Sequence, residues 1–287
     1  MYLRHFGLNQ APFTLTANPD FFFALPRHRE ALNTLLYAAH SGEGFILITG
    51  EIGTGKTMLC SKLIQDASSN FTIAHLPIPA RSARGLLLDL ARELGLPLSA
   101  GIDEATLVAL IREVLLEKAL QGQRALVCLD EAQALTPATL EALRLLTNLE
   151  TRHEKLLQVA VFGQPELETM LASDELRQLK QRITSHYRLE PINSADIGDY
   201  LEHRLRVAGY NGPRLFSPKA LKVMSEATGG VPRLLSIVAH KALLLVFGQG
   251  GHLVEGRHAE EAARDTPAAT PPRPRKSFLG ISLGSRR

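Results

Sequence analysis

The sequence predicts an α/β protein, in which a three-layer domain built on a parallel sheet is followed by a small domain made only of helices. Three observations lead to this fold class. Apolar, strand-like runs alternate with helix-period segments from about residue 45 to 190, which is typical of a mostly parallel sheet covered by helices. The runs 125–129 and 156–162 are apolar without alternation, as in strands buried on both faces. After Pro191 the strand signal ends.

The first part of the chain predicts strands and helices in alternation. Strands are expected at residues 45–49, 71–76, 125–129, 156–162 and 185–190. One helix is expected over 104–120, where Leu107, Leu110, Ile111, Val114 and Leu115 form a single stripe. Another begins at Thr136, an N-cap followed by proline at the first helical position, and a third spans 166–180.

The second part of the chain predicts four helices, at residues 194–208, 217–228, 231–247 and 255–265. Ser217 followed by Pro218 marks a helix start, and the pair Gly229 and Gly230 marks a helix end. The expected division is therefore an α/β domain at 1–192, a helical lid domain at 193–265 and a tail at 266–287.

The tail is basic and rich in proline, with five basic residues and no acidic one. It lacks the apolar periodicity of a core, so we expect it to be disordered. A solvated tail is the simpler interpretation, and a short basic docking segment for a membrane or a partner is the alternative. Without the tail the net charge falls from +3 to −2. A body so close to neutral does not predict a nucleic-acid groove.

The overall composition, 45% hydrophobic and 21% charged, is that of a globular protein. No run approaches 18 uninterrupted apolar residues and the N-terminus has no signal-peptide pattern, so neither a transmembrane helix nor a leader is expected. Cys60 and Cys128 lie in apolar segments and are expected to be buried, reduced thiols. The histidines have no zinc-ligand spacing.

A glycine-rich loop directly follows the first strand. Its sequence, GEIGTGKT, is a full G-x-x-x-x-G-K-[ST] phosphate-binding motif, and a helix-period segment follows it. The glycines let backbone N–H groups turn toward a phosphate, and the helix N-terminus adds partial positive charge. We expect this loop to bind ATP or ADP through Gly50, Glu51, Ile52, Gly53, Thr54, Gly55, Lys56, Thr57 and Met58. Lys56 is expected to reach the β- and γ-phosphates, and Thr57 to give its hydroxyl to Mg²⁺.

Two adjacent carboxylates end the apolar strand at 125–129. Buried charge is costly unless a partner compensates it, so a metal ion, a water or a phosphate-bearing ligand is expected beside them. With a phosphate loop in the same chain, Asp130 fits an Mg²⁺ ligand and Glu131 fits a general base for the attacking water. The pair favours an ATPase over a small-molecule kinase.

Three later residues are candidates for contacts with the γ-phosphate, where catalysis requires positive charge or a polar group. Gln164 follows the fourth strand, near the expected position of Asp130. Arg182 lies just before the fifth strand, and Arg233 opens a helix of the lid. A lone arginine is usually a surface residue, but the order of these three elements favours a catalytic role.

The motifs in this order resemble AAA+ ATPases, and more narrowly the ExeA/general secretion pathway protein A family. The N-terminal MYLRHFGLNQAPFTLTANPDFFF and HREALNTLLYA, and then GEIGTGKT, LDEAQ, GQPEL, QRI and GGVPR, are similar to that family's motifs over about residues 1–265. The resemblance implies a P-loop NTPase with Gln164 as sensor 1, Arg182 as an arginine finger acting in trans, and Arg233 as sensor 2. It also implies that residues 18–30 wall the adenine site.

The resemblance further implies a homo-oligomer with active sites between subunits. Members of the family act at the bacterial inner membrane in type II secretion or type IV pilus assembly, and those of the MSHA pilus are the most similar. The expected partners are therefore inner-membrane assembly proteins of a pilus or secretion system. The expected location is cytoplasmic, with membrane association only peripheral or through a partner.

The sequence departs from the family pattern in two places. Family members carry a transmembrane helix and a periplasmic peptidoglycan-binding domain after the ATPase, whereas this chain stops after the basic tail, so direct peptidoglycan binding is not expected. Many relatives also have an Asn after the second strand that restrains the catalytic glutamate, and Ile78 stands there instead.

Three functions remain open from the sequence. The first is an ATPase that serves pilus or secretion-system assembly. The second is a DNA-associated AAA+ ATPase, such as a transposition helper or an initiator-like factor, against which the near-neutral body argues. The third is a nucleotide-gated scaffold with little turnover, in which ATP only switches the oligomer.

Overall fold

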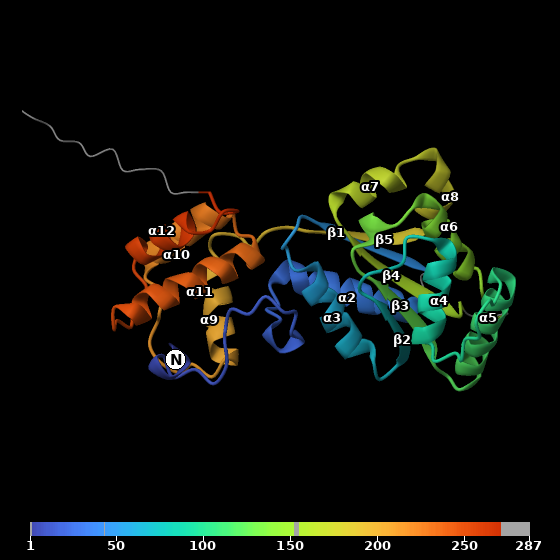
Figure 1. Cartoon of the computed structure of the whole chain (residues 1–287), viewed down its shortest axis with the longest axis horizontal. Coiled ribbons are helices and arrows are strands. Elements are labelled where there is room, and N and C mark those ends of the chain that lie inside the picture. The colour runs from blue at the N-terminus through green and yellow to red at the C-terminus, as the bar shows by residue number, and fades with distance from the viewer. Residues whose placement is uncertain (1, 43, 152–154, 271–287) are drawn as a thin grey trace, which may run out of the picture.

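The computed structural model describes residues 2–42, 44–151 and 155–270, and Figure 1 shows it as an α/β part beside a helical part. The expected tail falls mostly on residues 271–287, which lie outside the described residues. None of the helices in the described part of the chain combines the length and the apolar character that crossing a bilayer requires.

A five-stranded parallel sheet forms the centre of the α/β part, as the sequence predicts. Its strands are β1 (Phe45–Gly50), β2 (Phe71–Leu76), β3 (Arg124–Leu129), β4 (Leu157–Gly163) and β5 (Ile183–Leu189). They lie in the order β2-β3-β4-β1-β5, and each neighbouring pair is parallel. Each observed strand starts and ends within two residues of its predicted bounds.

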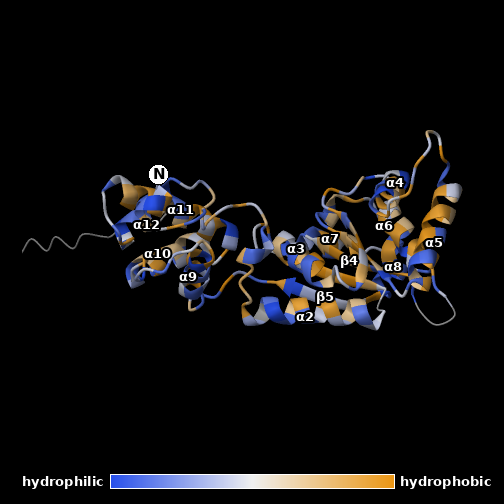
Figure 2. Ribbon diagram, turned by 90° about the horizontal axis from the view of Figure 1, so that it is seen from below, coloured by the Kyte–Doolittle hydropathy of each residue, from blue (hydrophilic) through white to orange (hydrophobic). Residues whose placement is uncertain are grey.

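Helices cover both faces of the sheet, which gives the expected three layers. On one face, Ile46 and Ile48 of β1 pack against α2 (Pro26–Ser41) and α3 (Lys56–Ala67). The opposite face packs against α4 (Ala83–Glu93), α5 (Glu104–Leu120) and α6 (Pro137–Leu146). Because both faces are covered, all of β4 is buried, and it is mostly hydrophobic in Figure 2. Cys60 and Cys128 are free and fully buried, as expected.

The prediction of a single helix over 166–180 is wrong. The segment forms α7 (Pro165–Leu171), a 3₁₀ turn at Asp174–Leu176 and the short α8 (Arg177–Lys180). Leu167 and Leu171 pack into the core at helical spacing, but the next core residue is Leu176, five positions on. A continuous helix would turn the charged residues Asp174 and Glu175 toward the core instead, so the chain breaks and restarts in a new phase.

The helical part contains the four expected helices, α9 (Ile197–Val207), α10 (Pro218–Thr228), α11 (Pro232–Gly248) and α12 (Gly256–Arg264). Gly229 ends α10 in the left-handed conformation, as predicted. At Gly230, φ is +77° and an added Cβ would lie 2.0 Å from the carbonyl oxygen of Ile192, so only glycine allows this close approach. The Ile192 backbone N–H donates to the Gly230 carbonyl at 2.9 Å, which ties the lid to the end of the α/β part.

The expected domain boundaries need two corrections. The N-terminal segment, with α1 (Tyr2–His5) and a 3₁₀ turn at Pro19–Phe21, packs most of its apolar side chains into the core of the lid, while Phe22 packs against the α/β core. Figure 1 shows the N-terminus beside the lid helices. At the other end, packing on the lid continues past residue 265. Ala269 is buried, and the Thr270 N–H donates to the Ala227 carbonyl at 2.8 Å.

Candidate active site

The strand order brings the predicted motifs together. The phosphate loop follows β1, Asp130 follows β3 and Gln164 follows β4, and these three strands are adjacent in the sheet. In a parallel sheet all carboxyl ends lie at one edge, and ligands of α/β proteins bind there. Segments more than 70 residues apart therefore meet at one place, beside the N-terminus of α3.

The loop at 50–57 has the shape of a phosphate cradle. Gly53 and Gly55 both have positive φ values, +82° and +103°, which favour glycine. Lys56 is buried, and its ammonium donates to the carbonyl oxygens of Gly50 and Glu51 at 2.7 and 3.0 Å. Burial lowers the pKa of Lys56, and the carboxylates of Glu131 and Asp130 oppose this change. A phosphate group would give this ammonium the stronger, charged acceptor that the loop lacks.

Thr57 and Asp130 fit the expected Mg²⁺ ligands. The Thr57 hydroxyl donates to Asp130 Oδ2 at 2.6 Å, and Asp130 is almost fully buried. Mg²⁺ prefers oxygen ligands and takes only one or two from protein when a phosphate supplies others. Two oxygens held this close, beside the cradle, suit an ion bound directly or through water.

Glu131 has an unusual backbone. Its φ is +52° and its ψ is +35°, and it is the one non-glycine residue of the described chain with positive φ. Such a conformation costs about 1–3 kcal/mol and is found where the surrounding structure imposes it. It turns the exposed carboxylate toward the end of β4. There Gln164 Nε2 lies 3.4 Å from Glu131 Oε2, so the candidate base and the candidate sensor are in contact.

A residue that the sequence analysis missed joins these two. Gln133 Nε2 donates to Glu131 Oε2 at 2.5 Å, and Gln133 Oε1 accepts from the backbone N–H of Gln164 at 3.0 Å. Its sequence signal was its place at the end of the LDEAQ motif, two residues after Glu131.

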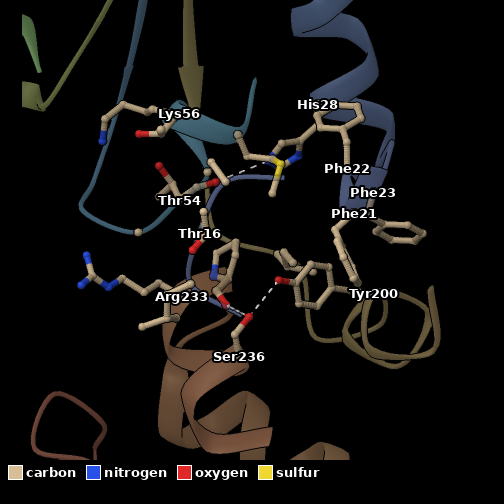
Figure 3. A pocket seen from close by; sticks show the side chains of 18 of the residues that line it. Thr16, Phe21, Phe22, Phe23, His28, Thr54, Lys56, Tyr200, Arg233 and Ser236 are labelled. Carbon is tan, nitrogen blue, oxygen red and sulfur yellow. Dashed lines mark hydrogen bonds between the residues drawn. The ribbon is translucent and has the colours of Figure 1, made fainter. Parts of the chain in front are cut away.

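The lid reaches the phosphate loop directly. The backbone N–H of Arg233 donates to the Gly53 carbonyl at 3.2 Å, at the start of α11. A Cβ at Gly53 would lie 2.9 Å from the Cβ of Arg233, so the loop and the lid helix are in close contact here. Figure 3 shows the Arg233 side chain on the Lys56 side of the pocket.

A cavity of about 280 Å³ lies between the α/β part and the lid. Most of the predicted site residues line it, namely Ile52, Gly53, Thr54, Gly55, Lys56, Thr57, Met58, Glu131, Gln164 and Arg233. Three predicted residues lie behind this lining and are bonded to it. Lys56 donates to the carbonyls of Gly50 and Glu51, and Thr57 donates to Asp130. The end of the cavity that the loop lines is therefore polar, as a bound phosphate would require.

The opposite end of the cavity is aromatic. Phe21, Phe22 and Phe23 of the N-terminal segment line it, with His28 at the start of α2 (Figure 3). These residues fall within 18–30, the segment predicted to wall an adenine site. His28 is buried, its Nε2 lies 3.5 Å from the Thr54 carbonyl, and burial lowers its pKa. A flat base fits between such side chains.

A buried hydrogen-bond network, also missed from the sequence, supports this aromatic end. Arg204 Nε and Nη2 donate to the carbonyls of Pro12 and Thr14 at 2.7 and 3.1 Å, and its Nη1 donates to the Tyr200 hydroxyl at 3.1 Å. Tyr200 in turn contacts the Ser236 hydroxyl at 3.2 Å, as drawn in Figure 3. The signal was present in the sequence, since Arg204 falls on the buried face of α9.

Arg182 is not part of this cavity. It immediately precedes β5, whose first residue, Ile183, is paired with Phe45 at the start of β1. The phosphate loop follows the other end of β1, so Arg182 lies at the opposite edge of the sheet. The charges near Glu150, which precedes β4, agree with this position. Lys155 lowers the pKa of Glu150, and Arg182 lowers it to a smaller extent.

Comparison with known proteins agrees with this geometry. Residues 39–171 match the model of a family described as AAA domain. The chain is 44% identical over 254 residues to the general secretion pathway protein A of Aeromonas hydrophila. This match covers 88% of the chain but 46% of the relative, so the chain spans about half the length of that protein.

Several solved structures have similar folds. The ORC2 protein of Aeropyrum pernix, solved in ADPNP-ADP complexes, superposes with a TM-score of 0.72 at 16% identity and covers 91% of this chain and 72% of its own. Cdc6p of Pyrobaculum aerophilum superposes with a TM-score of 0.69 at 18% identity, and the match covers 88% of this chain and 70% of that protein. At such identities the likeness shows the fold alone. The chain thus has the AAA P-loop NTPase fold, and over most of its length its sequence is similar to part of general secretion pathway protein A.

Proposed function

We propose that this chain is a Mg²⁺-dependent ATPase that supports assembly of a type IV pilus of the MSHA kind or of a type II secretion system. The observation that carries the proposal is the meeting of Lys56, Thr57, Asp130, Glu131 and Gln164 at one edge of the sheet, at the mouth of a cavity with an aromatic far end. Each group has the chemistry that hydrolysis of a γ-phosphate requires.

In the proposed reaction the loop N–H groups and Lys56 hold the β- and γ-phosphates. Thr57 and Asp130 would hold Mg²⁺, which would supply positive charge to the phosphate oxygens. Glu131 accepts a proton from water, whose oxygen then bonds to the γ-phosphorus while the bond to the β–γ bridging oxygen breaks. The products are ADP and inorganic phosphate. Gln164 orients the water, and Arg233 contacts the γ-phosphate from the lid.

The biological part of the proposal comes from the relative. General secretion pathway protein A is named for secretion, and 88% of this chain matches it. We therefore propose a homo-oligomer on the cytoplasmic side of the inner membrane, bound there peripherally or through an assembly protein. Binding of nucleic acid is not part of the proposal.

The direct test is an ATPase assay on the whole chain, with and without Mg²⁺, over a range of protein concentrations. We expect Mg²⁺-dependent phosphate release that rises more than linearly with protein concentration, because the active site is completed by a neighbour. Activity at a constant rate per subunit under strong dilution would contradict the oligomeric part. Complete lack of turnover, with ATP still bound, would instead support a nucleotide-gated scaffold.

A second experiment addresses the partner. Pull-downs from a pilus-bearing bacterium in the presence of a non-hydrolysable ATP analogue, or of ADP, should recover inner-membrane assembly proteins mainly in one nucleotide state. Recovery of pilus components would favour the MSHA-like role, and recovery of secretion components would favour type II secretion. Stimulation of turnover by duplex DNA that disappears at higher salt would argue against both.

A further inference from the structure

Gln133 is held at both ends of its side-chain amide. Its Nε2 donates to Glu131 Oε2 at 2.5 Å, and its Oε1 accepts from the Gln164 backbone N–H at 3.0 Å. One side chain thus connects the segment after β3 to the segment after β4. Gln133 Oε1 is bonded to the backbone N–H of Gln164, which directly follows β4. The sheet therefore fixes where the Nε2 end of the Gln133 side chain lies.

The carboxylate of Glu131 needs such support. It stands on a left-handed backbone, its side chain is exposed, and an unsupported exposed carboxylate samples several rotamers. The other contact to it, from Gln164 Nε2, is longer at 3.4 Å and goes to the same oxygen. In addition, Ile78, which follows the neighbouring strand β2, is 87% exposed and has no polar atom in its side chain.

We propose that Gln133 is a positioning residue, which holds Glu131 in the orientation that accepts the water proton and couples that orientation to the Gln164 segment. The inference rests on the proposed ATP hydrolysis. By binding Oε2, Gln133 leaves Oε1 of Glu131 free as the proton acceptor. When Gln164 shifts toward a bound γ-phosphate, the hydrogen bond from its backbone N–H moves the side chain of Gln133. The carboxylate of Glu131, which is bonded to Gln133, then moves as well.

The test compares Gln133→Leu and Gln133→Glu with the wild-type chain. The leucine removes both hydrogen bonds, and the glutamate keeps the shape and the acceptor for Gln164 but loses the donor and places a like charge beside Glu131. We expect both to lower kcat on the order of 10-fold, because the base spends most of its time in unproductive rotamers. KM and the Kd for ATP should change less than about 2-fold, since no phosphate contact is lost. Gln178→Leu, at an exposed glutamine of α8, is the matched control.

A double-mutant cycle separates positioning from a structural role. In the Glu131→Gln background, adding Gln133→Leu should leave the single-turnover rate unchanged, because Gln133 acts only through the carboxylate. An equal loss in both backgrounds would mean that Gln133 merely supports the loop, and would overturn the proposal. So would wild-type kcat in both Gln133 variants. If the wild-type chain itself has no turnover, the proposed hydrolysis fails first, and that result is distinguishable because no variant is needed to see it.

Discussion

At the scale of single residues, Glu131 and Lys56 divide the proposed work of the site. Lys56 is buried with only neutral carbonyl acceptors for its ammonium, and burial lowers its pKa. A bound triphosphate restores a charged partner, so Lys56 contributes to binding. Glu131 is exposed at the mouth of the cavity and makes no contact with the phosphate loop in the hydrogen-bond network described above. In the proposed mechanism Glu131 therefore acts in the chemical step, and we expect it to have little effect on ATP affinity.

Substitution of Lys56 should weaken ATP binding, whereas substitution of Glu131 should slow hydrolysis. Lys56→Ala is expected to lose ATP affinity, because nothing else in the loop neutralises the β- and γ-phosphates. Glu131→Gln is expected to bind ATP normally and to hydrolyse it at least ~100-fold more slowly, as for the loss of a general base. Equilibrium binding of a fluorescent ATP analogue and steady-state phosphate release measure the two effects. Near-wild-type turnover in Glu131→Gln would remove Glu131 from the mechanism.

At the scale of the elements, a buried arginine adds hydrogen bonds to the apolar packing that holds the N-terminal segment on the lid. Arg204 on α9 is buried, bonds two carbonyls of the segment and lies over the ring of Phe21, with 5.0 Å between its Cζ and the ring centroid. The planar guanidinium can make these contacts at once, whereas an ammonium is a single point charge. The aromatic end of the cavity is therefore held in place from the lid side.

Arg204→Met should loosen this wall. We expect a loss of about 2–4 kcal/mol in the free energy of unfolding, because the carbonyls of Pro12 and Thr14 lose their donors, together with weaker ATP binding. Arg206→Met is the control, since Arg206 is 69% exposed in the side chain and bonds Glu202 at the surface, where such pairs contribute ~1 kcal/mol or less. Thermal unfolding and ATP titration of both variants measure the difference. Equal stability of the two would contradict the role of Arg204.

The end of the lid gives a second prediction at this scale. Thr266 donates to the Ala262 carbonyl at 2.8 Å, Ala269 is buried, and Thr270 bonds Ala227. A chain that ends at Thr270 should therefore keep the melting temperature of the longer chain. One that ends at Asp265 should lose about 1–3 kcal/mol in the free energy of unfolding, from lost apolar burial and the lost hydrogen bonds of Thr266 and Thr270. Calorimetry of the two truncated chains decides, and identical melting curves would show that these residues add nothing.

At the scale of the whole molecule, Arg182 does not reach the cavity of its own subunit. It lies at the amino ends of the strands, whereas Lys56 and Glu131 lie beyond their carboxyl ends. If Arg182 acts on a γ-phosphate, it must act on that of a neighbouring subunit. Head-to-tail contact between identical subunits brings two such different surfaces together.

Mixing two inactive variants tests this role. Arg182→Ala should bind ATP and not hydrolyse it, since an arginine finger contributes several kcal/mol to the transition state. Lys56→Ala lacks bound ATP but keeps its Arg182. In an equal mixture, about a quarter of the sites would pair an intact loop with an intact arginine by random head-to-tail assortment, so partial activity should return. Mixed oligomers that form and stay inactive would leave Arg182 as an ordinary structural residue.

The sheet, the phosphate loop and the two carboxylates after β3 could all be predicted from the amino-acid sequence. These features depend on local chemistry: apolar runs form buried strands, and a G-x-x-x-x-G-K-[ST] loop binds phosphate wherever a strand and a helix flank it. The partners of these residues, in contrast, become visible only in the folded chain. The adjacency of β3, β4 and β1 joins Gln133 to Glu131 and Gln164, and the fold of residues 2–25 onto the lid buries Arg204. No local pattern encodes such contacts, because they join segments whose meeting depends on strand order and helix packing.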